Sequence, residues 1–400
     1  MNKKTVKDID LAGKKVIMRV DFNVPLDGTT ITDDTRIRAA VPTINYILEQ
    51  GTSLILMSHL GRPKGEKVPE LSLKPIADML SELSGKKVIM AGDCRGAEVK
   101  AQADALQAGE ILLLENTRFY AAEDAKGDDS DKTEMAKELA SLADVFVNDA
   151  FGTAHRAHAS TAVIADYMDV SVAGLLMEKE LEFLIGAIKN AEKPFIAIIG
   201  GAKISGKLQV LKSLLDKCDT IIIGGGMAYT FQKKLGYAIG ESIHEDELLD
   251  TAGEIMEAAK EKGVNLLLPL DNMIADDFSP DANKKVVMCE DGIPDGWEGL
   301  DIGPESAILF SDAIAKAKTV VWNGPMGCFE MAPFAAGTNA IVDAVAAADC
   351  VSIIGGGDSV SAVNQSGKAG QMSHISTGGG ASLELLEGKV LPGVDCLDNK

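Results

Sequence analysis

Arginine is missing from more than half of this sequence. All seven arginines lie at or before Arg156, and residues 157–400 carry positive charge only on lysine. The arginine guanidinium presents a planar fork of donors that matches carboxylate and phosphate groups, whereas the lysine ammonium is a point charge. We therefore expect the first part of the chain to bind a small anion.

Features of membrane, secreted and nucleic-acid-binding proteins are also lacking. No run of about 18 uncharged apolar residues occurs, so we expect no membrane-spanning helix and no membrane partner. The first ten residues are polar and have no apolar signal-peptide core, so we expect a cytoplasmic protein. The net charge of −21 repels nucleic acid, and we expect no nucleic-acid partner.

Sequence patterns of metal sites and disulfides are absent too. The six cysteines are scattered without any C-x-x-C pair, which argues against a zinc site and a disulfide framework. The five histidines include no H-E-x-x-H pair. We therefore expect no histidine-rich metal site.

Short apolar runs alternate with longer amphipathic stretches along nearly the whole chain. The runs are rich in Val, Ile and Leu without polar alternation, which is typical of strands covered on both faces of a parallel sheet. The sequence predicts such strands at Lys15–Val20, Ser53–Met57, Lys87–Met90, Ile111–Leu114, Asp144–Val147, Phe195–Ile199, Thr220–Ile223, Val264–Leu268, Lys285–Met288, Thr319–Trp322 and Cys350–Ile354. It predicts helices at Thr35–Glu49, Thr133–Leu142, Asp246–Lys262 and Pro333–Ala348. This alternation predicts a doubly wound α/β fold.

The length of the chain, 400 residues, exceeds what one hydrophobic core usually serves, so we expect two domains. Met177–Asn190 has the pattern of one amphipathic helix that ends before Pro194, and we expect it to join the domains. The domains are then residues 1–176 and 191–387. The acidic segment Ala122–Lys132 is predicted to be a solvated loop.

Polar and basic residues follow four predicted strands of the first domain. The carboxyl ends of parallel strands meet at one edge of a sheet, where α/β proteins bind ligands. In the first segment, Asp21 and Asn23 are two positions apart, so both side chains would point the same way toward hydroxyl groups; a capping turn is the alternative. The segments predict a basic rim, and they are Arg19–Pro25, Ser58–Pro63, Glu115–Phe119 and Asn148–His158.

Glycine-rich turns mark the second domain. Three of them follow predicted strands, at Gly200-Gly201, Gly224–Gly226 and Gly355–Gly357, and a fourth lies at Gly378–Gly380. Such turns let phosphate oxygens approach backbone N–H groups at a helix start, which predicts a nucleotide site. Asp358 follows the third turn, where it is either a helix cap or a Mg²⁺ ligand beside a phosphate.

The segment Gly201–Leu208 is close to a P-loop, G-x-x-x-x-G-K-[ST]. Its last position is Leu208, so the Mg²⁺-binding hydroxyl is missing and an ordinary P-loop NTPase is not favoured. Lys203 and Lys207 would share one face if a helix has already begun there. Two like charges so placed are unfavourable unless an anion lies between them.

Taken together, these segments resemble phosphoglycerate kinases over essentially the whole chain. The family's signatures VDFNVP, SHLGRP, ENxRF, DAFGTAHRAHAS, GGAKxSxK, WNGPxGxFE, GGGDS/T and STGGGA occur in order. They lie at Val20–Pro25, Ser58–Pro63, Glu115–Phe119, Asp149–Ser160, Gly200–Lys207, Trp322–Glu330, Gly355–Ser359 and Ser376–Ala381. The resemblance implies two Rossmann-like domains separated by a cleft, with the tail 388–400 packing back on the first domain. It also implies a monomeric, hinge-bending glycolytic enzyme that transfers a phosphoryl group reversibly between ATP with Mg²⁺ and 3-phosphoglycerate.

The same resemblance implies roles for individual residues. Arg36, Lys203 and Gly379 would act on the transferred phosphoryl group. The residues implied to contact 3-phosphoglycerate are Asp21, Phe22, Asn23, Arg36, His59, Leu60, Gly61, Arg62, Arg118 and Arg156. Those implied to contact ATP or ADP are Lys207, Gly224, Gly225, Gly299, Asn323, Glu330, Gly356, Gly357, Asp358 and Ser359, with Asp358 also holding Mg²⁺.

Three positions depart from the family pattern, and none removes a catalytic group. Gly206, Glu298 and Cys328 stand where Asp or Thr, Met and Val are common. An anion-binding sensor without turnover is the alternative of another class. Loss of one of the catalytic charges would favour that alternative, and Arg36, Lys203 and Asp358 are all present.

Overall fold

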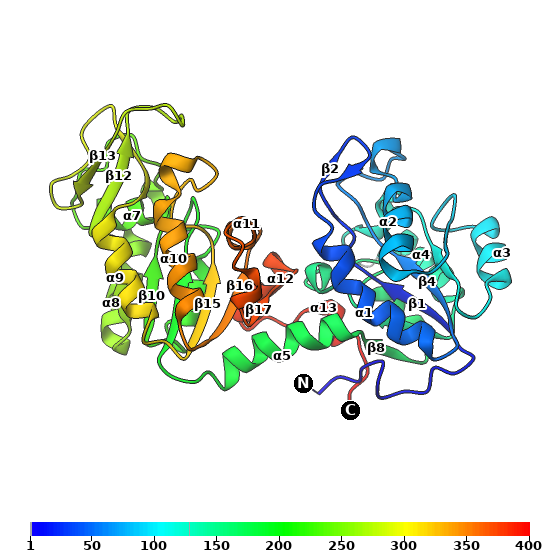
Figure 1. Cartoon of the computed structure of the whole chain (residues 1–400). Helices are drawn as coiled ribbons and strands as arrows, with labels where there is room; N and C mark the ends of the chain where they lie inside the picture. The colour runs from blue at the N-terminus through cyan, green and yellow to red at the C-terminus, as the bar shows by residue number, and fades with distance from the viewer. Residues whose placement is uncertain (1, 128) are drawn as a thin grey trace. The chain divides into compact units, whose positions relative to one another are not determined.

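The computed structural model describes residues 2–127 and 129–400. The chain divides into two units, one made of Met1–Glu182 with Val390–Lys400 and the other of Phe183–Lys389. Helix α5 (Leu175–Lys189) carries the chain from the first unit into the second (Figure 1). Each unit holds its own six-stranded parallel sheet with helices, which confirms the predicted α/β class and the two parallel sheets.

The sheet of the first unit has the strand order β5-β6-β4-β1-β7-β8, and all its neighbouring strands are parallel. Its strands are β1 (Lys15–Arg19), β4 (Ser53–Met57), β5 (Val88–Met90), β6 (Ile111–Leu113), β7 (Val145–Asn148) and β8 (Ser171–Ala173). A short hairpin is formed by β2 (Leu26–Asp27) and β3 (Thr30–Ile31). The helices of this unit are α1 (Thr35–Glu49), α2 (Lys74–Ser84), α3 (Ala97–Ala105), α4 (Ser130–Ala140) and α13 (Pro392–Asp395).

The core of the first unit follows from the two periodicities of its elements. Val16 and Met18 of β1 lie two positions apart and so face one side of the sheet. There they join a buried cluster with Ile44 and Ile47 of α1 and with Leu80 of α2. The apolar residues of α1 recur at the spacing that lines one helix face, so the helix buries one side against the sheet.

The end of the chain packs into the first unit. Within α13, the Gly393 N–H donates to the carbonyl oxygen of Ala154 at 2.8 Å. The Asn148 side chain donates in turn to the Gly393 carbonyl oxygen at 2.7 Å. The two chain ends also meet, because Lys3 and Asn399 form an antiparallel bridge (Figure 1). The C-terminal segment therefore packs against the carboxyl end of strand β7.

The sheet of the second unit has the order β11-β10-β9-β15-β16-β17 and is again parallel. Its strands are β9 (Phe195–Ile199), β10 (Thr220–Ile223), β11 (Asn265–Leu267), β15 (Thr319–Asn323), β16 (Val351–Gly355) and β17 (His374–Ile375). Its helices are α6 (Leu208–Leu214), α7 (Met227–Lys234), α8 (Leu249–Lys262), α9 (Pro304–Ile314), α10 (Ala336–Ala347), α11 (Gly357–Gln365) and α12 (Gly379–Leu386). On one face of this sheet, Trp322 and Val320 of β15 pack with Phe310 of α9 and Ile341 of α10 in a buried cluster.

A second, antiparallel sheet in this unit corrects one prediction. Its strands are β12 (Asp271–Ala275), β13 (Lys284–Met288) and β14 (Glu298–Ile302). The apolar run Lys285–Met288 was expected in a buried parallel sheet, whereas β13 is a mostly exposed edge strand paired antiparallel with β12. A short Val-Val run beside two lysines suits an edge strand as well as a buried one, so the sequence pattern alone does not separate them.

None of the helices in the described part of the chain combines the length and the apolar character that crossing a bilayer requires.

Candidate active site

Four loops of the first unit meet at the carboxyl edge of its sheet. They follow β1, β4, β6 and β7, which lie side by side in the order β6-β4-β1-β7. Because all four strands are parallel, their following loops share one edge. These loops are the four polar segments that the sequence singled out, so the structure brings the predicted basic rim together.

Arg36, in the first turn of α1, is held by the loop after β1. Its Nη1 donates to the two carboxylate oxygens of Asp21 at 3.3 and 3.2 Å and to the Asn23 carbonyl oxygen at 3.0 Å. About one third of the Arg36 side chain remains exposed, whereas Asp21 is buried. Arg36 is thus oriented by a carboxylate before any ligand binds, with part of its guanidinium open to solvent.

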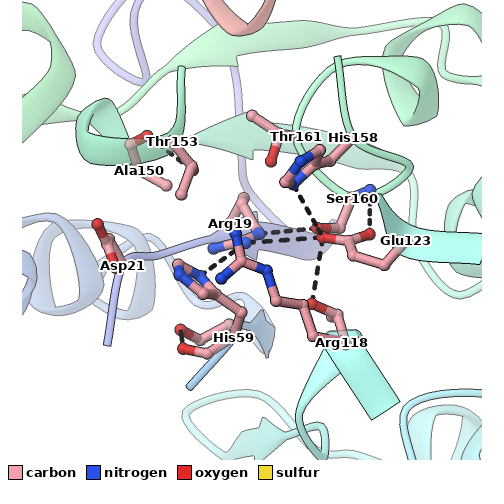
Figure 2. A network of polar contacts seen from close by, with 12 residues as sticks. Arg19, Asp21, His59, Arg118, Glu123, Ala150, Thr153, His158, Ser160 and Thr161 are labelled. Atoms are coloured by element: carbon pink, nitrogen blue, oxygen red, sulfur yellow. Dashed lines mark hydrogen bonds and ion pairs between the residues drawn. The ribbon is translucent and has the colours of Figure 1, made fainter. Parts of the chain in front are cut away.

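His59, after β4, lies beside the buried Arg19 at the end of β1 (Figure 2). The distance between His59 Nδ1 and Arg19 Nη2 is 3.2 Å. Burial, followed by the positive charge of Arg19 and Arg118, lowers the pKa of His59 well below its usual range. His59 is therefore a neutral ring in this site.

A buried carboxylate supports this side of the site and corrects a second prediction. Glu123 belongs to the segment Ala122–Lys132 that was expected to be solvated, yet its side chain is fully buried. Arg19 Nη2 lies 3.7 Å from Glu123 Oε1, and the Ser160 hydroxyl donates to the same oxygen at 2.6 Å (Figure 2). A buried carboxylate that has a guanidinium and a hydroxyl as partners does not need water to compensate its charge. Within the same segment, Asp128 lies outside the described residues.

The remaining residues expected to contact 3-phosphoglycerate fall into three groups. Phe22 and Leu60 have buried side chains in the core, so only their backbone can face a ligand. Arg62 and Arg156 are exposed. Arg118 Nη1 donates to the Gly61 carbonyl oxygen at 2.9 Å. In the described part of the chain, the buried Nε of Arg118 has no hydrogen-bond partner, which leaves a donor available.

Asn23 completes the rim by joining two of its loops. Its Oδ1 accepts from the Gly61 N–H at 2.8 Å. This bond leaves the amide of Asn23 half-buried at the same edge as Arg36. The loops after β1 and β4 are therefore fixed to each other by a side chain of the predicted site.

In the second unit, the glycine turns likewise gather at the carboxyl edge of a parallel sheet. The turns follow β9, β10 and β16, and Asn323 ends β15; these strands are adjacent in the order β10-β9-β15-β16. The backbones approach very closely there, since a Cβ added to Gly225 would lie 2.7 Å from the Gly201 nitrogen. Gly225 also has φ of 67°, a conformation that favours glycine.

Lys207 and Lys203 differ in their surroundings, and the condition under which they would share one helical face is not met. Helix α6 begins only at Leu208, so the two lysines do not share a helical face. Lys207 is half-buried and donates to Asn323 Oδ1, and burial lowers its pKa. Lys203 is exposed in the loop before it. The buried Nδ2 of Asn323 lacks a hydrogen-bond partner among the described residues.

Two helix starts lie against each other in the second unit. Gly356 precedes α11 with φ of 87°, and a Cβ added to Gly379 at the start of α12 would lie 3.0 Å from the Gly356 Cα. Asp358 is exposed in the first turn of α11. The next residue, Ser359, is fully buried and accepts from the Gly324 N–H at 2.6 Å. The N–H groups of two helices thus converge on one region, with a carboxylate beside them.

A cavity of about 600 Å³ opens next to these turns. Gly225, Gly299, Glu330 and Asp358, which were all expected to contact a nucleotide, contribute to its lining. The sequence interpretation missed several further lining residues, among them Tyr229, Phe278 and Ile243, because an isolated aromatic or aliphatic residue carries no motif. This volume and mixed lining are typical of a small-molecule site.

Crowding explains two of the glycines expected at the nucleotide. A Cβ at Gly224 would lie 2.3 Å from the Met326 sulfur, and one at Gly299 would lie 2.1 Å from the Tyr229 hydroxyl. Gly224 is not part of the cavity lining, whereas Gly299 is. Glu298 beside it also lines the cavity, and burial together with Asp277 raises the pKa of the Glu298 carboxyl.

Comparison with known proteins identifies the family. A sequence model of the phosphoglycerate kinase family matches residues 6–389. The chain belongs to the phosphoglycerate kinase family. It is similar to the solved structure of phosphoglycerate kinase from Coxiella burnetii, with 41% identity over 98% of both chains and a TM-score of 0.87. It is also similar to that of phosphoglycerate kinase from Pyrococcus horikoshii, with 31% identity over 98% of both chains and a TM-score of 0.84.

As a member of the phosphoglycerate kinase family, the chain is a phosphotransferase enzyme that uses a nucleotide and a small-molecule acceptor. The predicted family resemblance is thereby confirmed. The two solved relatives cover nearly all of this chain, so the likeness extends to both units.

A site for Mg²⁺ fits the residues present, although the described residues contain no group of three or more His, Cys, Asp or Glu side chains that could hold a metal. Mg²⁺ in nucleotide sites usually binds one or two carboxylates together with substrate phosphates. Asp358 offers one carboxylate that is exposed and lines the cavity.

Proposed function

We propose that the protein transfers a phosphoryl group reversibly between ATP and the carboxylate of 3-phosphoglycerate, giving ADP and 1,3-bisphosphoglycerate, as a step of glycolysis and gluconeogenesis. The proposal rests on the residues that gather at the carboxyl edges of the two parallel sheets. One edge gathers arginines and a neutral histidine, and the other gathers glycine turns beside a cavity. A cationic site for a small acid and a backbone site for a nucleotide are what this reaction requires.

The acceptor would bind at the carboxyl edge of the first unit. Arg62 and Arg156 are exposed there, and Arg118 keeps a free donor at Nε. Guanidinium groups bind a phosphate by paired hydrogen bonds. Asp21 and Asn23 would accept from the hydroxyl group of the acid, in agreement with the roles that the family resemblance implies.

The nucleotide would bind at the corresponding edge of the second unit. Its base and ribose suit the cavity, with Gly299 and Glu330 in the lining. Its phosphates would approach the backbone at Gly356, Gly357 and Gly379, where two helices begin. Lys207 would give up its bond to Asn323 or share it with a phosphate oxygen.

Mg²⁺ would be held by the Asp358 carboxylate and by the nucleotide phosphates. When bound, the metal neutralises charge on the phosphate oxygens. The protein residues do the remaining work of orientation. Asp358 fixes one ligand position from the first turn of α11, and Ser359 fixes that turn against Gly324.

The mechanism needs no general base. The acceptor carboxylate is ionised at neutral pH and can attack phosphorus directly. The residues then act by positioning and by neutralising charge on the moving phosphoryl group. Arg36 supplies a guanidinium from the first unit, while Lys203 and the Gly379 N–H supply donors from the second.

A coupled assay tests this proposal against the two alternatives. ATP is supplied with Mg²⁺, and 1,3-bisphosphoglycerate is consumed by added glyceraldehyde-3-phosphate dehydrogenase with NADH. We expect NADH oxidation only when 3-phosphoglycerate is present. ADP release without the acceptor would support an NTPase, and ligand binding without ADP release would support a sensor.

We further propose that the enzyme is a cytoplasmic monomer. The support for the compartment is that all six cysteines are free, which suits a reducing environment. The monomer is what the family resemblance implies. Light scattering after size-exclusion chromatography would give the mass of one 42.1 kDa chain. A mass of twice that value would contradict the monomer, and fractionation of the source cells would test the compartment.

A further inference from the structure

Arg19 is a buried cation whose donors are almost all engaged inside the first unit. Its Nε donates to the Ser160 hydroxyl at 2.7 Å, and its Nη1 donates to the Val20 carbonyl oxygen. Its Nη2 lies 3.2 Å from His59 Nδ1 and 3.7 Å from Glu123 Oε1. Figure 2 shows Arg19 between His59 and Glu123. Arg19 has no exposed surface with which to bind a ligand itself.

The contact between Arg19 and His59 fixes the position of the imidazole proton. A guanidinium has only donors, so His59 Nδ1 must accept. In a neutral ring, the proton then lies on Nε2. Among the described residues, none forms a hydrogen bond with His59 Nε2. The ring therefore keeps one donor for a ligand.

The charged groups around His59 act against its protonation. Arg19 of β1, Arg36 of α1, Arg118 after β6 and His158 after β7 all face the ring and disfavour a further positive charge. Asp21 and Glu123 are the nearby carboxylates, and they pair with Arg36 and Arg19 respectively. Burial also lowers the pKa of His59, and it is the largest cause of that shift.

Glu123 anchors Arg19 through several buried bonds. The Ser160 hydroxyl accepts from Arg19 Nε and donates to Glu123 Oε1 at 2.6 Å. The Ser160 N–H donates to Glu123 Oε2 at 3.0 Å, and the Thr117 hydroxyl donates to Oε1 at 3.2 Å. A carboxylate bound by these donors balances the buried cation and fixes its direction.

We propose that Arg19 is a positioning residue that holds His59 as a neutral donor, with its proton on Nε2, toward an anionic ligand at this edge of the sheet, and that Glu123 anchors Arg19. The inference rests on the proposed function only for the identity of that ligand, 3-phosphoglycerate. A neutral donor binds the acid with the same strength on both sides of the usual histidine titration. A cationic histidine would lose its charge within the range of about pH 5 to 8.

Nitrogen NMR of the full chain labelled at histidine tests the first part without substrate. The His59 signal is assigned by its loss in His59→Gln. We expect an acceptor-type Nδ1, a protonated Nε2, and no change between about pH 5 and 8. A proton on Nδ1, or a titration with its midpoint inside that range, would overturn the proposal. This measurement supports or overturns the proposal even if the enzyme shows no turnover with 3-phosphoglycerate.

The double variant Arg19→Met with Glu123→Gln tests the positioning role. Both charges are removed together, so no uncompensated buried charge remains. We expect the His59 ring to mix its two neutral tautomers, because burial, Arg118 and Arg36 still disfavour its protonation. Relative to the wild type, KM for 3-phosphoglycerate should rise about tenfold at both pH 6 and pH 8, with kcat changed little. Taking the ratio to the wild type cancels the titration of the substrate phosphate.

A matched control removes another arginine–carboxylate pair from the same unit. Arg38 Nη2 and Asp34 Oδ2 form a partly exposed ion pair at 2.7 Å at the start of α1, and Arg38→Met with Asp34→Asn should leave the His59 signals and the KM ratio unchanged. A double variant at Arg19 and Glu123 that loses stability but keeps the wild-type His59 signature would show a structural role only, and would overturn the proposal.

Discussion

At the scale of single residues, Arg36 is oriented by its neighbours in the absence of any ligand. Three hydrogen bonds from Nη1 to Asp21 and Asn23 hold the guanidinium while part of it stays exposed. Arg36→Ala should lower kcat by about 10²–10³-fold, because a donor aimed at developing charge is lost. Steady-state kinetics with ATP and 3-phosphoglycerate would measure the change.

The control for this variant is Arg36→Lys, which keeps the charge but loses the planar fork. It should recover only part of the rate. Circular dichroism of both variants should match the wild type, because Arg36 is only half-buried. A value of kcat above half of the wild-type value in Arg36→Ala would remove Arg36 from the transition state.

The single residues that the sequence did not identify are those whose role depends on distant partners. Glu123 stands among small and acidic residues, so its own segment predicts solvation. Its buried state depends on Arg19 and Ser160, which are remote in the sequence. Lys207 was identified because a motif surrounds it, and Arg36 because the family resemblance implies its role.

At the scale of secondary-structure elements, α11 places a carboxylate beside two glycine-rich helix starts. Asp358→Asn should weaken the affinity for ATP with Mg²⁺ by on the order of tenfold or more, because a neutral amide does not balance the charge of the metal. The affinity for 3-phosphoglycerate should stay close to that of the wild type. Isothermal titration with each ligand separately would measure both. Equal losses for the two ligands would show that Asp358 is structural.

An unusual acid, Asp149 directly after β7, lies against the start of helix α5. Asp149 is buried and accepts from the Met177 N–H at 2.9 Å, and burial raises its pKa to about 7. The folded state therefore keeps the proton up to about pH 7, whereas the unfolded chain releases it near pH 4. Its contribution to the free energy of unfolding is thus full below about pH 4 and is lost as the pH rises toward about 7.

Asp149→Asn removes this titration. The difference in unfolding free energy, variant minus wild type, should become more positive from about pH 4 to about pH 8. Urea unfolding at several pH values would measure it, and Asp34→Asn at the N-cap of α1, a carboxyl whose pKa is lowered and not raised, is the control. Parallel stability curves for Asp149→Asn and the wild type would contradict the raised pKa.

The sequence predicted some elements better than others for physical reasons. Ser53–Met57, Phe195–Ile199 and Thr220–Ile223 were predicted with the bounds that they have, because a continuous apolar run requires cover on both faces. The strand β12 was missed because it begins with Asp271 and Asn272. These polar residues are buried, and Asp271 is bonded by Ser306 of α9, which is a tertiary contact.

At the scale of the whole molecule, the residues proposed to bind the acceptor and those proposed to bind the nucleotide belong to different units of the chain. In-line transfer requires reacting atoms about 3–3.5 Å apart. We expect the like charges of Arg36 and Lys203 to oppose a close approach unless a shared phosphoryl group lies between them, so one ligand alone should not bring the units together. We expect the radius of gyration to fall clearly only with Mg²⁺, an ATP analogue and 3-phosphoglycerate together. An unchanged radius in solution scattering across the apo, singly bound and doubly bound states would contradict a hinge.

The central claim is that a carboxylate receives the phosphoryl group of ATP, and trapping of the product tests it most directly. The enzyme is mixed with γ-labelled ATP, Mg²⁺ and 3-phosphoglycerate for a single turnover, and hydroxylamine is then added. An acyl phosphate reacts to give a hydroxamate and releases labelled phosphate, whereas a phosphate ester does not react. We predict one hydroxamate for each ADP formed, and a strongly reduced yield with Arg36→Ala in the same time. ADP formation without hydroxamate would contradict the account.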